Sequence, residues 1–217
     1  MFVDCEKDSF NMDLDQLEQK ITLKSGAIIA TSIHGHPVDL DRLDKIKSMH
    51  PSLLIFQDCA HSFAAQWNGR CVHENSDASI FALNISKLMT SIFGGMITTN
   101  DHKLAAHLSA WKVGKQKRNV FRGFKCLAYL VMSWLVLHPS MFGILKNLLN
   151  LSFFQKFIIY YDENIIELPS DYLDCMSNVE ASVGIAQLKK YDDLVRHNRR
   201  IAAVYVEALK DEKKLSL

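Results

Sequence analysis

The sequence predicts an α/β fold, in which a mostly parallel sheet with flanking helices is followed by a helical C-terminal part. Two apolar, β-rich runs at residues 27–33 and 53–56 are predicted strands. Each follows a segment with apolar residues at helical spacing, residues 13–21 and 39–50 respectively. This alternation is typical of parallel strands joined by crossover helices.

Further strand and turn signals extend the sheet. The dipeptide Asn68-Gly69 is a strong hairpin signal, because both residues tolerate the backbone conformation of a tight turn. Residues 78–83 and 95–99 are two more predicted strands, and a helix is expected over residues 101–112.

The second half of the chain begins with a basic and apolar region. Residues 102–161 contain nine Lys or Arg and no Asp or Glu, so the remainder carries 16 basic and 24 acidic residues. A cationic linker at 112–125 precedes an apolar run at 126–137 and an amphipathic helical pattern at 141–161. Such a pairing can lie on an anionic membrane surface.

The run at 126–137 is too short to span a bilayer, which takes about 20 apolar residues. We therefore favour a buried helix or a subunit contact over peripheral membrane contact through residues 112–161. Nucleic-acid binding is not expected, because the region lacks a recognised module.

The last part of the chain is predicted to be helical. Ser177 and Glu180 have the spacing of a capping box, which begins a helix, and a second helical pattern covers residues 192–210. The apolar stripes of both helices, between residues 179 and 209, are expected to face a core.

Length and composition indicate a globular protein of 217 residues. We divide it into residues 1–112, a basic insertion at 113–161 and a helical part at 162–217. The five cysteines are odd in number and scattered, which predicts reduced thiols and a cytoplasmic protein. No signal peptide is visible at the N-terminus.

Two ionisable residues, Asp58 and Lys87, each follow a predicted strand. In an open α/β sheet, ligands bind beside the carboxyl ends of the strands. An acid and an amine placed there suit pyridoxal phosphate, whose ring nitrogen needs a carboxylate and whose aldehyde needs a lysine. The alternative is that Asp58 caps a helix and Lys87 is a solvated loop lysine.

Other reactive side chains have simpler interpretations. His34 and His36 lie in a predicted turn without the spacing of metal ligands, and no metal site is predicted. Cys59 could be a reactive thiol, but a lone cysteine beside a strand is more often a small core residue.

Five short motifs resemble those of the DegT–DnrJ–StrS family of sugar aminotransferases, in the family's order. The resemblance covers most of residues 1–112 and residues 172–210. It implies the fold type I architecture of pyridoxal-phosphate enzymes, here with an incomplete large domain. The motifs are His34-Gly35-His36-Pro37-Val38-Asp39-Leu40, Asp58-Cys59-Ala60-His61, Ser86-Lys87, Gly94-Gly95-Met96-Ile97-Thr98-Thr99-Asn100-Asp101 and Met176-Ser177-Asn178-Val179-Glu180-Ala181.

The resemblance implies a site and a reaction. Lys87 would bond covalently to pyridoxal 5'-phosphate and move the substrate proton, Asp58 would hold the ring nitrogen, and His61 would lie near the ring hydroxyl. Family members with His in place of this lysine act as dehydratases, so Lys87 favours transamination. The implied substrates are a glutamate-like amino donor and a nucleotide-linked keto-sugar of polysaccharide or sugar biosynthesis, and the implied assembly is a homodimer.

Several positions depart from the family's pattern. Ala82 replaces a phosphate-binding Ser, Phe93 replaces an acidic residue, and Leu173-Asp174-Cys175 replaces an Asn-Tyr-Arg run. The family's phosphate-binding Gly-Thr segment would lie upstream of Met1, and its closing strands after Leu217. These departures motivate an alternative function, a non-catalytic truncated homologue that acts as an interaction or membrane-surface module.

Overall fold

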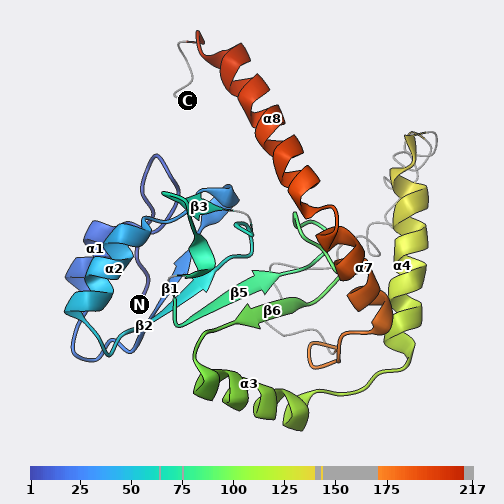
Figure 1. The fold of residues 1–217 in the computed structure, drawn as a ribbon, viewed down its shortest axis with the longest axis horizontal. Helices are drawn as coiled ribbons and strands as arrows, with labels where there is room; N and C mark the ends of the chain where they lie inside the picture. Colours follow the sequence, from blue (N-terminus) through green and yellow to red (C-terminus); the bar gives the residue numbers. More distant parts are fainter. Residues whose placement is uncertain (64, 75, 140–142, 144–170, 213–217) are drawn as a thin grey trace. The chain divides into compact units, whose positions relative to one another are not determined.

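Figure 1 shows the computed structural model of the protein, which describes residues 1–217 except 64, 75, 140–142, 144–170 and 213–217. Two compact units are present. Met1–Ala110 and Ser182–Leu217 form the first unit, and Trp111–Ala181 form the second. The three-part division expected from the sequence stays a prediction.

The described helices and strands follow the order expected from the sequence, and most ends agree within two or three residues. The elements are α1 (Leu14–Lys20), β1 (Ala27–Thr31), the 3-10 turn η1 (Ile33–Gly35), α2 (Leu40–Met49), β2 (Leu54–Asp58), β3 (Gln66–Trp67), β4 (Arg70–Cys71), the 3-10 turn η2 (Val72–Glu74), β5 (Ala78–Ala82), β6 (Gly95–Thr98), α3 (His102–Lys115), α4 (Phe121–Leu137), α7 (Asn178–Leu188) and α8 (Tyr191–Leu209).

The central sheet has the strand order β1-β2-β5-β6 (Figure 1). Strands β1, β2 and β5 are parallel, and β6 pairs antiparallel with β5. The register pairs Asp58 with Thr31 of β1 and with Ile80 of β5. This arrangement confirms the predicted mostly parallel sheet with flanking helices.

Aspartates begin the two helices that connect the first strands. Asp13 caps α1 by accepting hydrogen bonds from the backbone N–H groups of Asp15 and Gln16, at 2.9 and 3.0 Å. Asp39 caps α2 by accepting from the N–H of Arg42 at 3.0 Å. Each cap satisfies donors that the first helical turn leaves without an intrahelical partner.

The predicted hairpin is present as β3 and β4. Asn68 and Gly69 have φ angles of 49° and 82°, the left-handed conformation that a two-residue type I′ turn requires at both positions. The hairpin is attached to α2, because the Trp67 indole N–H donates to Asp41 at 2.7 Å and Arg70 pairs with Asp44 at 2.9 Å.

The core lies between one face of the sheet and the helices α1 and α2. Alternate strand residues supply the sheet side, and the apolar stripes of the two helices supply the other. The buried residues of this core are Leu14, Leu17, Ile28, Ala30, Val38, Leu40, Leu43, Ile46, Leu53, Ile55, Cys59, Val72 and Phe81. Cys59 is therefore a core residue, as expected, and burial raises the pKa of its thiol.

The opposite face of the sheet carries apolar side chains that remain exposed. Ile29 is 60% exposed and Ile97 is 51% exposed, and Leu54 and Ile80 are also exposed. Because side chains alternate along a strand, Asp58 lies on this same face, two positions beyond Phe56 and four beyond Leu54. We call it the open face of the sheet.

The second unit contains α4, which is joined to the start of α7 by a buried ion pair. The guanidinium of Arg122 donates two hydrogen bonds of 2.8 Å to the carboxylate of Glu180. Arg122 is 11% exposed and Glu180 is fully buried. The predicted capping box is also present, because Ser177 N donates to the Glu180 carboxylate at 2.7 Å and Glu180 N donates to Ser177 Oγ at 3.3 Å.

Two expectations for this half of the chain are wrong. The stretch 112–125 is not a linker throughout, because α3 continues to Lys115 and α4 begins at Phe121. The apolar positions of α7 and α8 do not form a core face, since Leu188 and Tyr205 are exposed and Val183 is only half-buried. The predicted amphipathic helix at 141–161 falls outside the described residues, apart from Gly143.

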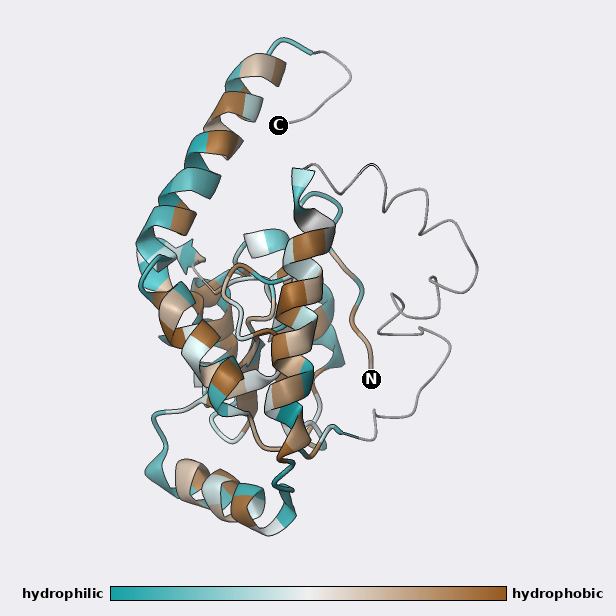
Figure 2. Ribbon diagram, turned by 90° about the vertical axis from the view of Figure 1, so that its right-hand side faces the viewer, coloured by the Kyte–Doolittle hydropathy of each residue, from teal (hydrophilic) through white to brown (hydrophobic). Residues whose placement is uncertain are grey.

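Apolar residues recur along the whole of α4, as the brown colouring of Figure 2 shows. Phe124 is 74% exposed and Trp134 is 66% exposed. Among the described residues, no helix combines the length and the apolar character that a bilayer span requires.

Candidate functional site

Asp58 is the last residue of β2, so its carboxylate lies at the carboxyl end of the parallel strands. Its Oδ1 accepts a hydrogen bond from the backbone N–H of Ala60 at 3.0 Å. Its Oδ2 is 3.5 Å from the hydroxyl of Thr31, at the end of the neighbouring strand β1. The loop after β2 thus orients the carboxylate, as an Asx turn does.

Lys87 lies in the loop that follows β5. The loop folds back on itself, because Lys87 N donates to Asn84 O at 3.0 Å and Ser91 N donates to Leu83 O at 2.8 Å. Lys87 is half-buried. Since β2 and β5 are adjacent and parallel, the loops that follow them emerge at the same edge of the sheet.

Lys87 and His61 line one cavity at this edge, with a volume of about 460 Å³. That volume lies within the roughly 300–1,000 Å³ typical of small-molecule sites. The cavity is lined by His34, Ala60, His61, Phe63, Ala82, Ser86, Lys87, Leu88 and Met89. The structure therefore brings together two of the three site residues predicted from the sequence.

Asp58 does not line this cavity. Asp58 adjoins the cavity through Ala60. Ala60 is a lining residue, and its backbone N–H donates a hydrogen bond to the Asp58 carboxylate. Asp58 is half-buried at the margin of the open face. Its position at the end of the strand agrees with the sequence, and its carboxylate lies beside the cavity rather than in its lining.

His34 is a cavity residue that the sequence did not predict. It has a φ angle of 53° in the turn after β1, and its ring contacts the ring of His61 edge-on, with centroids 6.0 Å apart. Gly35 follows with a φ angle of 80°. The His-Gly-His-Pro motif predicted a turn at the carboxyl end of a strand. Ligands bind at this edge of a sheet, so the position of the turn could have identified His34 as a site residue.

The lining suits the ring of an aromatic aldehyde better than its phosphate. Phe63, Leu88 and Met89 supply apolar surface, and Lys87 supplies an amine. Ser86 supplies the one hydroxyl among the described lining residues, whereas Ala82 brings only a methyl group to the place where the family resemblance expects a hydroxyl. The residues present thus fit the ring and the aldehyde of pyridoxal phosphate.

A second cavity, of about 590 Å³, shares His34, His61, Phe63 and Leu88 with the first. It is also lined by Asn198 and Arg199 of α8. Phe63 helps to position α8, because Phe63 O accepts a hydrogen bond from the Tyr191 hydroxyl at 3.2 Å and the two rings pack edge-on. A guanidinium and an amide beside the Lys87 cavity can bind an anionic, hydroxylated ligand.

Known proteins with similar sequences or structures share this architecture. GDP-perosamine synthase of Escherichia coli O157:H7 is 27% identical over 205 residues, which are 94% of this chain and 44% of that protein. The aminotransferase PseC of Helicobacter pylori, involved in the biosynthesis of pseudaminic acid, superposes with a TM-score of 0.67 at 18% identity, over 98% of this chain and 46% of that one.

An Escherichia coli GDP-4-keto-6-deoxy-D-mannose-3-dehydratase has a structure solved with bound hydrated pyridoxal phosphate. It superposes with a TM-score of 0.67 at 20% identity, over 97% of this chain and 47% of that one. The expected cofactor is thus one that a solved neighbour carries. The chain spans a little under half the length of the curated relatives that match it along most of its length.

The family model of the DegT/DnrJ/EryC1/StrS aminotransferases matches residues 1–126 and 166–217. The matched residues include both predicted site strands, the loops that carry His61 and Lys87, and helices α7 and α8. The stretch 127–165, which includes most of α4, lies outside the match. This chain therefore belongs to the DegT/DnrJ/EryC1/StrS aminotransferase family.

Proposed function

We propose that this protein is a pyridoxal-phosphate-dependent aminotransferase that transfers an amino group from a glutamate-like donor to a nucleotide-linked keto-sugar. One observation carries the proposal: Lys87 and His61 line one cavity at the carboxyl edge of a parallel sheet, beside the strand that ends in Asp58. Family membership supplies the reaction class.

Each site residue has a separate chemical role in this proposal. Pyridoxal phosphate, when bound, supplies an electron sink for negative charge at the substrate carbon. Lys87 holds the cofactor and carries the proton to and from that carbon. Asp58 accepts a charge-assisted hydrogen bond from the ring nitrogen, and His61 contacts the ring hydroxyl.

The apolar walls of the cavity would assist this chemistry once a ligand ring displaces water from them. Phe63, Leu88 and Met89 line the same cavity as Lys87 and supply its apolar surface. A dry site strengthens the electrostatic contacts that orient the reacting groups. The presence of Lys87 in place of a histidine favours transamination over dehydration, two reactions that occur among the solved neighbours.

The substrate proposal rests on the adjoining cavity and on the relatives. Arg199 offers a positive charge beside the Lys87 cavity, which suits the diphosphate of a nucleotide sugar. GDP-perosamine synthase is one of the matched relatives. We further propose a homodimer, as the family resemblance implies, and a cytoplasmic location, with which the five free cysteines agree.

Reductive trapping of the cofactor tests the proposal. Purified protein is incubated with pyridoxal phosphate, treated with borohydride and digested, and the modified peptide is identified by mass spectrometry. We expect one cofactor per chain, attached to Lys87. The variant Lys87→Ala should lose the visible absorbance of the cofactor–lysine linkage, whereas Lys45→Ala, which removes an exposed lysine of α2, should keep it.

Two results would count against the proposal. One is labelling spread over several exposed lysines with equal efficiency in both variants. The other is a protein that binds the cofactor at Lys87 but forms no 2-oxoglutarate from L-glutamate in a single turnover. The second result would leave the cofactor site intact and remove the aminotransferase reaction.

A second candidate function, peripheral membrane binding, rests on α4. Phe124 and Trp134 are exposed on this helix, and basic residues flank it in a region without acidic ones. Apolar anchors next to cations bind anionic lipid surfaces. A binding role of this kind requires no catalytic residue.

Co-sedimentation with vesicles tests this second function. We expect the wild-type protein to sediment with vesicles rich in phosphatidylserine, and the double variant Phe124→Glu/Trp134→Glu to sediment at least tenfold less. The control Phe10→Glu changes an exposed aromatic residue of the first unit and should sediment like the wild type. Equal sedimentation of all three proteins would exclude α4 as a membrane anchor.

A further inference from the structure

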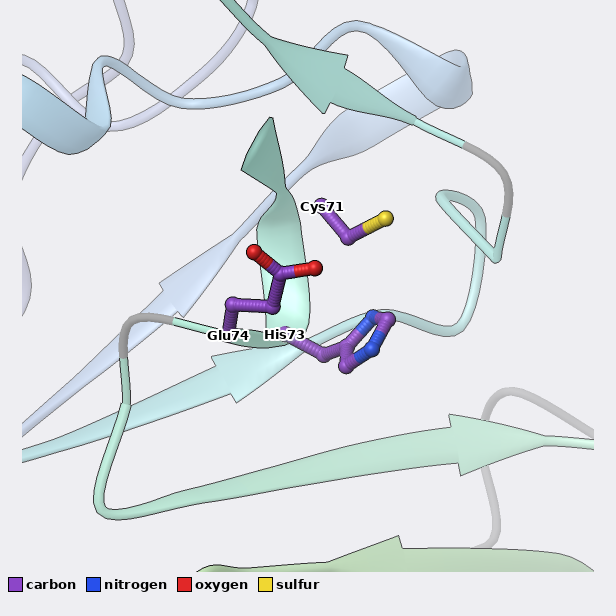
Figure 3. A group of neighbouring side chains, drawn as sticks. All are labelled: Cys71, His73 and Glu74. Atoms are coloured by element: carbon purple, nitrogen blue, oxygen red, sulfur yellow. The ribbon is translucent and has the colours of Figure 1, made fainter. Parts of the chain in front are cut away.

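Cys71, His73 and Glu74 direct three potential metal-binding atoms toward one point. Cys71 ends β4, and His73 and Glu74 belong to the 3-10 turn η2 that follows it. The thiol sulfur, an imidazole nitrogen and a carboxylate oxygen lie within 4.8 Å of one another. Figure 3 shows the three side chains pointing into the same space.

The backbone of this segment is held by the core beneath it. Val72, between two of the ligand residues, is 1% exposed, and its N–H donates to Ala65 O at 3.2 Å. Cys71 and His73 flank this buried residue in the chain, so the core holds the backbone on which both side chains are carried. Cys71 is also fixed by its pairing with Gln66 in the hairpin.

His73 is positioned by contacts on two sides. Its ring packs edge-on against Phe81 of β5, with centroids 5.8 Å apart. Its carbonyl oxygen accepts hydrogen bonds from the hydroxyls of Ser76 and Ser79, at 3.3 and 3.4 Å. The turn that carries the ligands is therefore ordered before any ion arrives, which reduces the entropy lost on binding.

The kinds of ligand select the class of metal. Thiolate, imidazole and carboxylate are the three side-chain ligands of zinc. Sulfur and nitrogen donors favour late first-row transition metals, whereas magnesium and calcium prefer oxygen ligands only. Three protein ligands leave the fourth tetrahedral position open to water, as in exchangeable zinc sites.

Small side-chain movements complete the geometry. Bonds of about 2.0–2.3 Å to a tetrahedral ion place the ligand atoms roughly 3.3–3.8 Å apart. The ligand atoms lie at most 4.8 Å apart, so shifts of about 1 Å suffice, and the exposed side chains of His73 and Glu74 have room for them. We propose that Cys71, His73 and Glu74 bind one zinc-class divalent ion with an open coordination position.

This site is independent of the proposed cofactor chemistry. None of its three residues lines the cavity that contains Lys87 and His61. Binding of a divalent ion releases the thiol proton of Cys71 to solvent, so the affinity increases with pH. A ligand that binds only the folded hairpin also stabilises it.

Cobalt titration of the chelator-treated full chain tests the site. Co²⁺ is followed by its thiolate charge-transfer absorption, and Zn²⁺ is then added to displace it. We expect one equivalent of Co²⁺ per chain, with loss of the charge-transfer band in Cys71→Ser and at least tenfold weaker binding in His73→Ala and Glu74→Gln. The matched controls Cys5→Ser and His50→Ala, both at exposed residues, should bind as the wild type does.

Circular dichroism of the metal-free variants separates loss of a ligand from loss of the fold. Glu74→Gln keeps the size of an exposed side chain, so this variant should fold and still bind cobalt weakly. The proposal is overturned if folded Glu74→Gln and Cys71→Ser titrate like the wild type. It is equally overturned if the cobalt absorption of the wild type disappears in Cys5→Ser.

Discussion

The carboxylate of Glu180 accepts hydrogen bonds from three donors: two from the Arg122 guanidinium and one from the backbone N–H of Ser177. Burial of Glu180 opposes ionisation, but the bonds from Arg122 and Ser177 outweigh it and lower the pKa of the carboxyl. In turn, the hydrogen bonds to Glu180 raise the pKa of Arg122. Both groups therefore remain charged although they are buried.

Removal of the Glu180 charge should destabilise the second unit. The variant Glu180→Gln leaves the buried Arg122 without its counter-ion, which typically costs about 3–5 kcal/mol. Urea denaturation followed by circular dichroism measures the loss. The control Glu207→Gln breaks an exposed ion pair with Lys210 and should cost no more than about 1 kcal/mol.

The difference between wild type and Glu180→Gln should depend on pH. A carboxyl whose pKa is lower in the folded state stabilises the fold above its unfolded pKa of about 4.3, and this contribution is lost as the pH falls through the folded value. The two proteins should therefore differ most near pH 7 and converge in acid. A difference that grows on acidification would contradict this assignment.

Contacts between residues that are close in the chain could be predicted from the sequence better than contacts between distant residues. The capping box of Ser177 and Glu180 could be predicted because both partners lie within four residues. Arg122 lies 58 residues away from Glu180, and no sequence pattern links the two. In the same way Lys87 and His61 were identified by motifs, whereas His34 joined their cavity only through the fold.

At the level of elements, the strands were predicted closely because their apolar runs are short and end at turns or polar residues. The β1, β2, β5 and β6 strands lie within two residues of the predicted runs. Helices α7 and α8 were also located correctly, but their burial was not. An apolar stripe shows that a helix has a face to cover and does not identify what covers it.

The pairing of β5 with β6 depends on a glycine. An added Cβ on Gly95 would lie 2.9 Å from Phe81 O, and the register places Gly95 opposite Ala82. Gly95→Ala should therefore destabilise the first unit by about 1–3 kcal/mol, because the strand must move. Gly26→Ala, where no atom lies within 4 Å of the added carbon, should change stability by less than about 1 kcal/mol in urea denaturation. Equal midpoints for the two variants would show that β6 adapts without cost.

At the scale of the whole molecule, the two faces of the central sheet differ in burial among the described residues. One face of the sheet is covered by α1 and α2, and the open face carries exposed Ile29, Ile80 and Ile97. Likewise the cavity of Lys87 offers apolar surface for a ring, with Ala82 at the position where the family resemblance expects a phosphate-binding serine. Comparison with the family's motifs predicted that Ala82 replaces this serine, whereas composition and periodicity did not predict that one face of the sheet is exposed.

The position of Asp58 on the open face links these two features. Ile29 and Ile80 share that face with the Asp58 carboxylate, which lies at its carboxyl edge. Any protein surface that covers the isoleucines also borders the aspartate and lowers its access to water. Under the proposed function, a protein surface that buries these isoleucines would therefore also enclose the carboxylate that we propose as the partner of the cofactor's ring nitrogen.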